Sequence, residues 1–505
     1  MLDRLPGLTR QPAPPAGRRL LCCLLAVLVG LTGFLAAPAE AVDKGRPSRE
    51  LVARVNQPAQ GDLDAMVQRR HLRFLVTFNK TNYFLDGPVQ RGVTYEYAKN
   101  FVDFLNKRLQ TKHLKVFLVM VPVTRDQLLP MLTEGKGDIA AASLSITPER
   151  LKTVDFSTPI YDQAKEVVVT APGAPELGSL ADLSGKRVYV RKSSSYFESL
   201  GKLNQKLAQE GKAPVIIEPA DEHLETEDIL EMVNVGLVNY TVADDFLADL
   251  WSKVFTSLRV RGDLVLASQV KIAWAIRQHS PQLKKALDKF IVKYRKGSTL
   301  GNILVKRYYE NNKFVENSLT VERMDRFKET VQFFKQYAGQ YNMDWLLLTA
   351  LAYQESGLDQ SKKSPVGAVG VMQLLPRTAA GHPVYIKRID LLENNVHAGV
   401  KYLRHIYDQN FRDIAGMTDV DKILLTFASY NAGPAKVASL RAVTQKMGLN
   451  PKVWFNNVEV AAARKIGRET VQYVGNIYKY YVAYRRALDL ERQKTAVKDK
   501  LGNGK

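Results

Sequence analysis

The alternation of short apolar runs with helical stretches stops near residue 310, and this change most constrains the fold. Over residues 61–310, runs rich in β-branched and aromatic residues alternate with helical stretches. Such alternation predicts an α/β domain with mostly parallel sheets. Over residues 318–490, helical patterns follow one another between Gly and Pro turns, which predicts a mainly α domain. The sequence therefore predicts a multidomain chain with a boundary within residues 308–320.

Individual elements and the flanking segments follow from the same patterns. Residues 42–60 are expected to form a linker, and the charged tail 491–505 is expected to fray. Strands are expected at residues 72–78, 116–121, 166–170 and 187–190, and helices at residues 95–109 and 125–134.

The first 41 residues have the pattern of a secretory signal peptide. Four arginines precede an uncharged apolar run from Leu20 to Ala37, and Ala39 and Ala41 are small residues at a cleavage position. Since the run is close to the minimum length for a membrane span, a retained anchor is the alternative. No other stretch approaches that length, and no lipid anchor is expected.

Charge and cysteine content narrow the function classes. Both cysteines, Cys22 and Cys23, lie inside the signal, so the mature chain would have no disulfide and no cysteine nucleophile. The net charge is +21, and removing four Arg and two acids with the signal leaves +19. Such a charge favours an anionic partner, and export makes nucleic acid an unfavourable choice. A cell-wall polymer or lipid head groups fit better.

A helix ending at Glu355 is the first candidate catalytic element. Asp344 is placed as its N-cap and Gly357 as its stop. Leu348, Leu351 and Ala352 share a face with Glu355 at helical spacing, so the carboxyl continues an apolar stripe. Desolvation and the helix C-terminus both raise the pKa of such a carboxyl, which suits a general acid. Taken alone, this helix leaves open that Glu355 bends to solvent or pairs with a lysine.

The residues that follow bring polar groups into Gly-punctuated turns. One loop runs from Ser364 to Gln373 before Pro376, and a second turn over residues 428–434 (ASYNAGP) ends a helix. Glycine lets backbone approach a ligand closely. Each turn alone is ordinary.

Together, these segments resemble the lytic transglycosylase domain of the goose-lysozyme-like superfamily over about residues 330–485. The matching pieces are Glu355-Ser356, Gly370-Val371-Met372-Gln373, Asn395 with Gly399 and Tyr402-Leu403, Tyr430-Asn431-Ala432-Gly433, and Glu469-Thr470 with Tyr473-Val474. Two departures are Val371 where the family usually has Leu and Ser429 where it has Ala. No Pro precedes Glu469, so that segment matches more loosely.

The resemblance implies a lyase that cleaves peptidoglycan with one carboxyl. Glu355 would protonate the oxygen between N-acetylmuramic acid and N-acetylglucosamine, then take the proton of the muramic C6 hydroxyl, leaving a 1,6-anhydro ring. The substrate supplies the nucleophile, so the second carboxylate of other glycosidases is not needed. Substrate-binding roles are implied for Ser364, Met372, Gln373, Tyr430, Asn431 and Glu469.

The earlier domain resembles family 3 solute-binding proteins, which are two-lobed α/β receptors. The resemblance covers about residues 65–305 and is clearest over residues 137–161 (GDIAAASLSITPERLKTVDFSTPIY). It implies that Arg150 grips a ligand carboxylate by a bidentate pair. The alternative is a structural salt bridge from Arg150 to Glu149 or Asp155. The other residues implied at the ligand site are Tyr83, Ser145, Thr147 and Asp244.

A ligand with both an amine and a carboxylate would be a free amino acid or a peptide stem of the wall. Closure of the two lobes around it could alter access to the catalytic site. The pairing of these domains resembles exported wall enzymes held peripherally at the outer membrane, which implies a periplasmic location.

Two other functions stay open. A lysozyme-type muramidase would use the same Glu355 with water as nucleophile, and an inactive relative would serve as a solute-binding sensor. No metal or other cofactor is expected, because the seven His are scattered and no metal-binding spacing occurs. His397 and His405, two turns apart on one expected helix, are interpreted as structural.

Overall fold

The computed structural model describes residues 55, 57–86, 89–111, 113–310 and 321–502. The expected signal peptide and its two cysteines lie outside the described residues. The described residues all belong to one compact unit, Lys44–Lys505. None of the described helices is long and apolar enough to cross a membrane.

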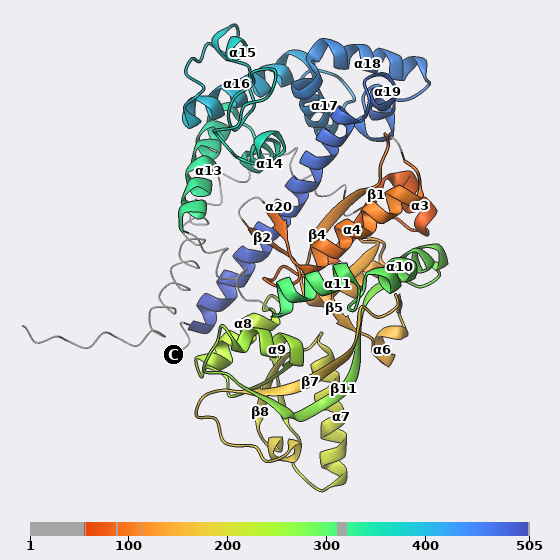
Figure 1. Cartoon of the computed structure of the whole chain (residues 1–505), viewed down its shortest axis with the longest axis vertical. Helices are drawn as coiled ribbons and strands as arrows, with labels where there is room; N and C mark the ends of the chain where they lie inside the picture. The colour runs from red at the N-terminus through yellow and green to blue at the C-terminus, as the bar shows by residue number, and fades with distance from the viewer. Residues whose placement is uncertain (1–54, 56, 87–88, 112, 311–320, 503–505) are drawn as a thin grey trace, which may run out of the picture. The chain divides into compact units, whose positions relative to one another are not determined.

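The first lobe of the α/β part surrounds three parallel strands. The strands β4, β1 and β5 are adjacent in the main sheet, and helices α4 and α10 lie beside them (Figure 1). Phe74, Phe101, Trp274 and Phe290 form the aromatic centre of this core, with Phe74 and Trp274 edge to face at 5.2 Å. The bounds of its elements are α3 (Leu63–Arg69), β1 (His71–Val76), β2 (Phe84–Asp86), β3 (Val89–Arg91), α4 (Val93–Arg108), β4 (Phe117–Pro122), η2 (Arg125–Gln127), α5 (Leu128–Thr133), β5 (Ile139–Ser145), α6 (Pro148–Leu151), β6 (Val154–Phe156), α10 (Pro281–Tyr294), α11 (Thr299–Val305) and η4 (Lys306–Glu310).

The second lobe is built on two long antiparallel strands that continue the same sheet. β7 pairs with β11 and β10, and the sheet order is β10-β7-β11-β5-β1-β4, with β6 paired to β11. Two clusters of buried side chains cover its faces, one around Trp251 and one around Leu200. The bounds of its elements are β7 (Tyr161–Thr170), η3 (Leu180–Leu183), β8 (Arg187–Arg191), α7 (Ser195–Gln209), β9 (Ile216–Ala220), α8 (Thr226–Asn234), β10 (Tyr240–Asp244), α9 (Asp245–Ser252) and β11 (Arg259–Arg277).

The prediction of mostly parallel sheets is wrong. Parallel pairing is confined to β1 with β4, β1 with β5, and β8 with β9, whereas the remaining strand pairs are antiparallel. The reason is that β11 returns along β7, β5 and β6 through both lobes, so one strand of 19 residues makes antiparallel pairs in each. Strand–helix alternation in the sequence does not reveal such a return.

The expected elements are present with small changes at their ends. The strands expected at 72–78, 116–121, 166–170 and 187–190 correspond to β1, β4, the end of β7 and β8. The helix expected at 95–109 is α4, and the one expected at 125–134 is divided into η2 and α5.

The described residues of the C-terminal part form helices joined by turns and loops, as expected. Helix α13 packs on α14 and α16, while α14, α17 and α19 pack on the long helix α20. The bounds are α13 (Val321–Tyr341), α14 (Trp345–Ser356), α15 (Pro376–Ala380), α16 (Leu392–Asn410), α17 (Asp419–Ala432), α18 (Pro434–Lys446), η5 (Trp454–Val458), α19 (Glu459–Lys465) and α20 (Arg468–Gly502).

The tail does not fray over residues 491–502, contrary to the prediction. These residues continue α20 as a helix. Lys494 and Lys498 form ion pairs of 2.7 and 3.0 Å with Asp228, whose side chain is buried at the start of α8. The tail has little apolar surface to bury, but its lysines meet a carboxylate that would otherwise be buried without a counter-charge.

A buried ion cluster links distant segments of the first lobe. Asp138 is fully buried and accepts hydrogen bonds from the backbone and guanidinium of Arg73 and from Arg69. Burial alone would raise the pKa of Asp138, but the two guanidinium groups outweigh it and the pKa is lowered. Asp138 is therefore a charged carboxylate in the folded protein, facing the two guanidinium groups.

Replacing Asp138 with Asn should lower the free energy of unfolding by about 3–5 kcal/mol, because Arg73 would lose its buried counter-charge. Urea denaturation followed by fluorescence measures this difference. The matched control is Asp263→Asn, which breaks an exposed pair with Arg261 and should cost less than about 1 kcal/mol. An equal decrease in the free energy of unfolding in the two variants would contradict the stabilising role of the buried Asp138–Arg73 pair.

Candidate active site

Helix α14 begins and ends at the residues that the sequence indicated. The Asp344 side chain accepts a hydrogen bond of 2.7 Å from the Leu346 backbone N–H, as an N-cap does. Gly357 ends the helix with φ 73°, the left-handed conformation that glycine adopts without a steric penalty. These two caps fix where the last turn, which carries Glu355, is placed.

The environment of α14 differs from the expected one-sided stripe. Every residue from Trp345 to Ala352 is buried, so the helix is surrounded by protein on all sides over most of its length. Only its last turn reaches partial exposure, at residues 353–355. Glu355 therefore lies in the last turn of a buried helix, at the point where the helix reaches the protein surface.

The Glu355 carboxyl has the electrostatics of a general acid. Burial raises its pKa to about 7, and the charge of Glu469 adds to this increase. A hydrogen bond from Tyr473 and the charge of Lys362 act in the opposite direction. With a pKa near neutrality, the carboxyl is present in both its acid and its carboxylate form at physiological pH.

The Tyr473 hydroxyl is the one hydrogen-bond partner that the described residues offer to this carboxyl. It donates to Glu355 Oε1 over 2.5 Å from helix α20. The Tyr473 side chain is buried, and burial together with the neighbouring Glu355 raises its pKa well above the usual value. Tyr473 therefore stays protonated and acts as a hydrogen-bond donor, not as a base.

The loop that follows α14 is held against Glu355 by side chains from two helices. Ser356 Oγ donates to the Val371 carbonyl over 2.9 Å. Asn395 of α16 accepts from the Met372 N–H and donates to the Val369 carbonyl, each over 2.8 Å. Gly370 has φ 76°, and a Cβ there would lie 2.5 Å from the Asn395 amide, so only glycine fits.

Tyr430 completes this arrangement from helix α17. Its hydroxyl donates to the Met372 carbonyl over 2.9 Å, and the charge of Glu355 contributes to its raised pKa after burial. Gly399 of α16 leaves space for the Met372 side chain, which a Cβ would approach within 2.6 Å. Met372 is thus fixed between α16 and α17.

Of the other expected substrate residues, Ser364 and Gln373 belong to this loop, and Asn431 and Glu469 lie on α17 and α20. The Gln373 side-chain nitrogen donates to the Lys362 and Gly370 carbonyls, and these two hydrogen bonds stabilise the loop. Ser364 Oγ accepts from the Ala368 N–H. Asn431 Oδ1 accepts from Thr470 Oγ1 over 2.7 Å, and Glu469 is exposed at the start of α20. Their contacts with substrate remain predictions.

Two functional roles were missed by sequence reasoning. Tyr473 and Asn395 were recognised as matching residues, but no role was assigned to either. Tyr473 is 118 residues from its partner Glu355, and Asn395 is 23 residues from Met372. Only their place within matching motifs could have indicated them, because spacing along the chain does not show a contact between helices.

His397 packs against two tyrosine side chains. His397 stacks on Tyr337 with ring centroids 4.1 Å apart and is hydrogen-bonded to the Tyr341 hydroxyl. Among the residues that the structure describes, no group of three or more His, Cys, Asp or Glu side chains could hold a metal ion.

Comparison with known families assigns both parts of the chain. Residues 332–453 match the transglycosylase SLT domain, and residues 91–310 match the bacterial extracellular solute-binding proteins, family 3. The chain joins a solute-binding domain to an SLT domain. The first match contains Glu355, the loop to Gln373, Asn395 and Tyr430, and the second contains the second lobe and the part of the first lobe from Arg91 onward.

Several curated proteins resemble the chain over most of its length. Each is called membrane-bound lytic murein transglycosylase F. The protein of Shewanella woodyi is 29% identical over 82% of this chain and 85% of its own, and that of Idiomarina loihiensis 29% over 83% and 91%. The protein of Desulfosudis oleivorans is 28% identical over 85% and 92%. Among solved structures, an ancestral arginine-binding protein bound to arginine is 22% identical over 48% of this chain and 99% of its own, with a TM-score of 0.40.

Arg150 lies between the two lobes of the solute-binding domain. Its guanidinium donates to the Ser145 carbonyl of the first lobe over 2.8 Å and to the Ser193 carbonyl of the second over 3.0 Å. It forms no ion pair with Glu149 or Asp155 in the structure, since Glu149 pairs with Lys152. The structural salt bridge considered from the sequence is therefore absent.

Other expected ligand residues also join the lobes. Ser145 Oγ lies 3.1 Å from Ser195 Oγ, and Thr147 Oγ1 donates to Glu198 over 3.3 Å. Sequence reasoning missed a stronger link: Glu225 of the second lobe accepts from Arg125, Asn79 and Thr77 of the first lobe. The two lobes are thus in direct contact across these polar residues.

Asp244 is placed beside a second acid that the sequence did not single out. Asp244 and Glu166 are paired residues on β10 and β7, and each has one buried carboxylate oxygen without a hydrogen-bond partner. Burial, followed by the charge of Glu166, raises the pKa of Asp244 to about 7. Two adjacent, incompletely satisfied carboxyls favour a ligand that carries a cationic group.

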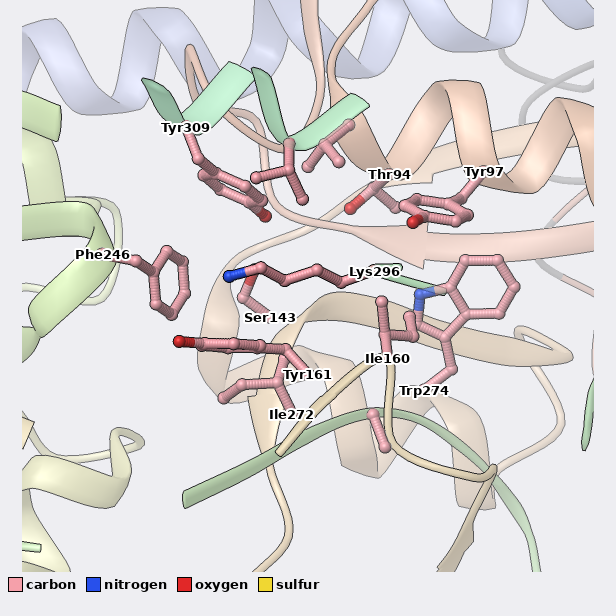
Figure 2. A pocket seen from close by; sticks show the side chains of 13 residues that line it. Thr94, Tyr97, Ser143, Ile160, Tyr161, Phe246, Ile272, Trp274, Lys296 and Tyr309 are labelled. Atoms are coloured by element: carbon pink, nitrogen blue, oxygen red, sulfur yellow. The ribbon is translucent and has the colours of Figure 1, made fainter. Parts of the chain in front are cut away.

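The expected role of Tyr83 at the ligand site stays a prediction. Tyr83 is fully buried and its hydroxyl donates to Gln90, so it belongs to the core of the first lobe. Figure 2 shows a largely apolar pocket of about 90 Å³, in which the Lys296 ammonium lies near the Tyr161 ring at 4.9 Å. Trp274, Phe246 and Tyr309 are also among its walls (Figure 2).

Replacing Tyr473 with Phe should move the alkaline limb of the pH–rate profile upward by about one unit. The Tyr473 hydroxyl favours the charged form of Glu355 and lowers its pKa. A hydrogen bond to a charged group is worth about 1.5–3 kcal/mol, and one pKa unit is about 1.4 kcal/mol. The measurement is kcat/KM on isolated murein between about pH 5 and about pH 9.

Tyr407→Phe is the matched control, because Tyr407 is a half-buried tyrosine of α16 that contacts Arg404 instead. Its profile should be unchanged. A Tyr473→Phe profile identical to that of the wild type would show that this hydroxyl does not set the pKa of Glu355.

Proposed function

We propose that this chain is a murein lytic transglycosylase in which Glu355 is the only catalytic acid and base. The observation that carries this proposal is the Glu355 carboxyl at the end of a buried helix, with a pKa of about 7 and a hydrogen bond from Tyr473. The SLT domain match and the names of the relatives support the same activity.

The proposed reaction uses the two protonation states of Glu355 in turn. The protonated carboxyl gives its proton to the oxygen between N-acetylmuramic acid and N-acetylglucosamine as the bond to the anomeric carbon breaks. The resulting carboxylate then removes the proton of the muramic C6 hydroxyl, whose oxygen bonds to the anomeric carbon. Glu355 ends as an acid, and the product carries a 1,6-anhydro ring without addition of water.

A single carboxyl is sufficient for this sequence of steps. Hydrolytic glycosidases generally place a second carboxylate across the scissile bond to activate water or to attack carbon. Among the groups that shift the pKa of Glu355, Glu469 is the one other carboxylate, and it is exposed at the start of α20. We expect Glu469 to bind or orient substrate together with Ser364, Gln373 and Asn431.

Location and partners follow from the charge, the resemblance and the relatives. The net charge of +21 favours the anionic surfaces of the cell envelope. The relatives are called membrane-bound, which supports an envelope location for this chain. We propose that it acts on peptidoglycan in the periplasm, with peripheral contact to the outer membrane.

Glu355→Gln should reduce murein digestion by at least about 10³-fold, because the amide cannot deliver a proton. The wild type should release products one water lighter than those of a muramidase, as mass spectrometry of digested murein can show. The matched control is Glu329→Gln, an exposed glutamate of α13, which should keep full activity.

Products with reducing ends would favour the lysozyme-type alternative. Wild-type protein without any murein digestion would favour the inactive sensor. Full activity in Glu355→Gln would refute the assignment of the acid.

For the solute-binding domain, we propose a ligand with both an ammonium and a carboxylate, such as an amino acid or a wall peptide. Asp244 and Glu166 offer unsatisfied carboxylate oxygens, and Arg150 lies between the lobes. Binding that changes how the lobes meet would alter the catalytic domain through α20, whose Lys494 contacts Asp228 of the second lobe.

Asp244→Asn should weaken the binding of a soluble muropeptide by about tenfold or more, as isothermal titration calorimetry can measure. In the wild type, saturating muropeptide should change the rate of murein digestion, and Asp244→Asn should respond only at higher concentrations. A rate independent of muropeptide would refute the regulation, and unchanged affinity would refute the role of Asp244. Asp263→Asn is the exposed control.

A further inference from the structure

A polar cavity of about 250 Å³ lies between the first lobe of the solute-binding domain and helix α20. It is separate from the expected ligand residues and from Glu355. Three lysines contribute to its lining: Lys99 from α4, Lys115 before β4 and Lys479 from α20. Asp103 is the one acidic residue of the lining.

Close packing of α20 on β4 holds the walls of this cavity together. Gly475 faces the ring of Phe117, and a Cβ at Gly475 would lie 2.7 Å from that ring. Glycine therefore lets the helix backbone approach the strand closely. One residue later, Asn476 lines the cavity, and Lys479 follows one turn after Gly475. The cavity is thus built into the contact of the two domains.

The charge of the lining is not balanced by the protein. None of the three lysines makes an ion pair within the described parts of the chain, and neither does Asp103. Burial and the charge of Lys99 lower the pKa of Lys479 to about 8, although Asp103 acts against this shift. Lys115 and Lys479 are half-buried, whereas Lys99 and Asp103 are exposed.

Neutral hydrogen-bond donors accompany these cations. The side-chain amides of Gln472 and Asn476 line the cavity from α20 without a hydrogen bond to the described residues. The Gln90 oxygen accepts from Tyr83, which leaves the Gln90 amide N–H groups as donors. Ammonium and amide donors around one polar space are the groups that bind oxyanions.

We propose that this cavity binds a small soluble oxyanion, through a carboxylate or phosphate group held by Lys479, Lys115 and Lys99. The ligand would replace the missing counter-charge of Lys479 and bridge α4 to α20. Because Gln472 directly precedes Tyr473, the donor to Glu355, the anion would occupy the same helix turn that serves the catalytic carboxyl.

Calorimetric titration of the full chain with sulfate and with malonate, at constant ionic strength set by chloride, tests the proposal. Saturable binding of sulfate indicates a phosphate-type ligand, and saturable binding of malonate a carboxylate. Lys479→Met should weaken binding by about tenfold or more, while Lys479→Arg should stay within about threefold of the wild type. Absence of saturable binding by both anions would overturn the proposal.

The matched control is Lys436→Met, an exposed lysine of α18 whose loss changes the net charge equally. It should leave the affinity unchanged, and equal weakening in Lys436→Met and Lys479→Met would overturn the site. If Lys479→Met does not fold, Lys99→Met is the test, since Lys99 is exposed, and it should weaken binding by about threefold. Unchanged affinity in Lys99→Met would then overturn the proposal.

A pH series adds an independent readout. Lys479 is charged below a pKa of about 8 and neutral above it, in a lining that also contains Lys99, Lys115, Asp103 and Tyr95. Sulfate affinity of the wild type should therefore fall between about pH 7 and about pH 9, more steeply than in Lys479→Met. The same slope in both proteins would contradict the role of Lys479.

Discussion

The hydrogen bond from Tyr473 to Glu355 is the contact on which the proposed catalytic site depends. It joins the end of a buried helix to the long helix α20, and it acts on a carboxyl whose pKa burial raises to about 7. Burial alone would favour the neutral form, whereas the hydroxyl stabilises the carboxylate. The balance of these two effects allows one group to give a proton and then to accept one.

The rest of the SLT domain positions what surrounds this pair. Asn395 uses both ends of its amide to hold the loop after α14, and Tyr430 binds the Met372 carbonyl from another helix. These contacts satisfy the Met372 N–H and carbonyl and give the Val369 carbonyl a second donor beside the Leu374 N–H. The loop next to Glu355 is thereby fixed by polar contacts to α16 and α17, with Gly370 and Gly399 allowing the close approaches.

Local signals in the sequence predicted a large part of this structure. Asp344 and Gly357 fixed the ends of α14, because caps act within a few residues. The return of β11 through both lobes and the contact of Lys494 with Asp228 were not predictable, since both depend on segments that meet only in the folded chain. The same limit applied to Tyr473, whose role depends on a partner 118 residues away. At Arg150 the family resemblance indicated the position, but not the two carbonyls that the guanidinium contacts.

Direct titration of the Glu355 carboxyl measures whether this group can act as an acid at neutral pH. The protein would be labelled with ¹³C at the glutamate side-chain carboxyls, and the NMR spectrum of Glu355→Gln would identify the resonance of Glu355. We expect a midpoint near pH 7, because burial raises the pKa of this carboxyl. A midpoint close to the ordinary glutamate value of about 4.3 would contradict it, because the carboxyl would then be ionised at neutral pH and could not serve as the acid.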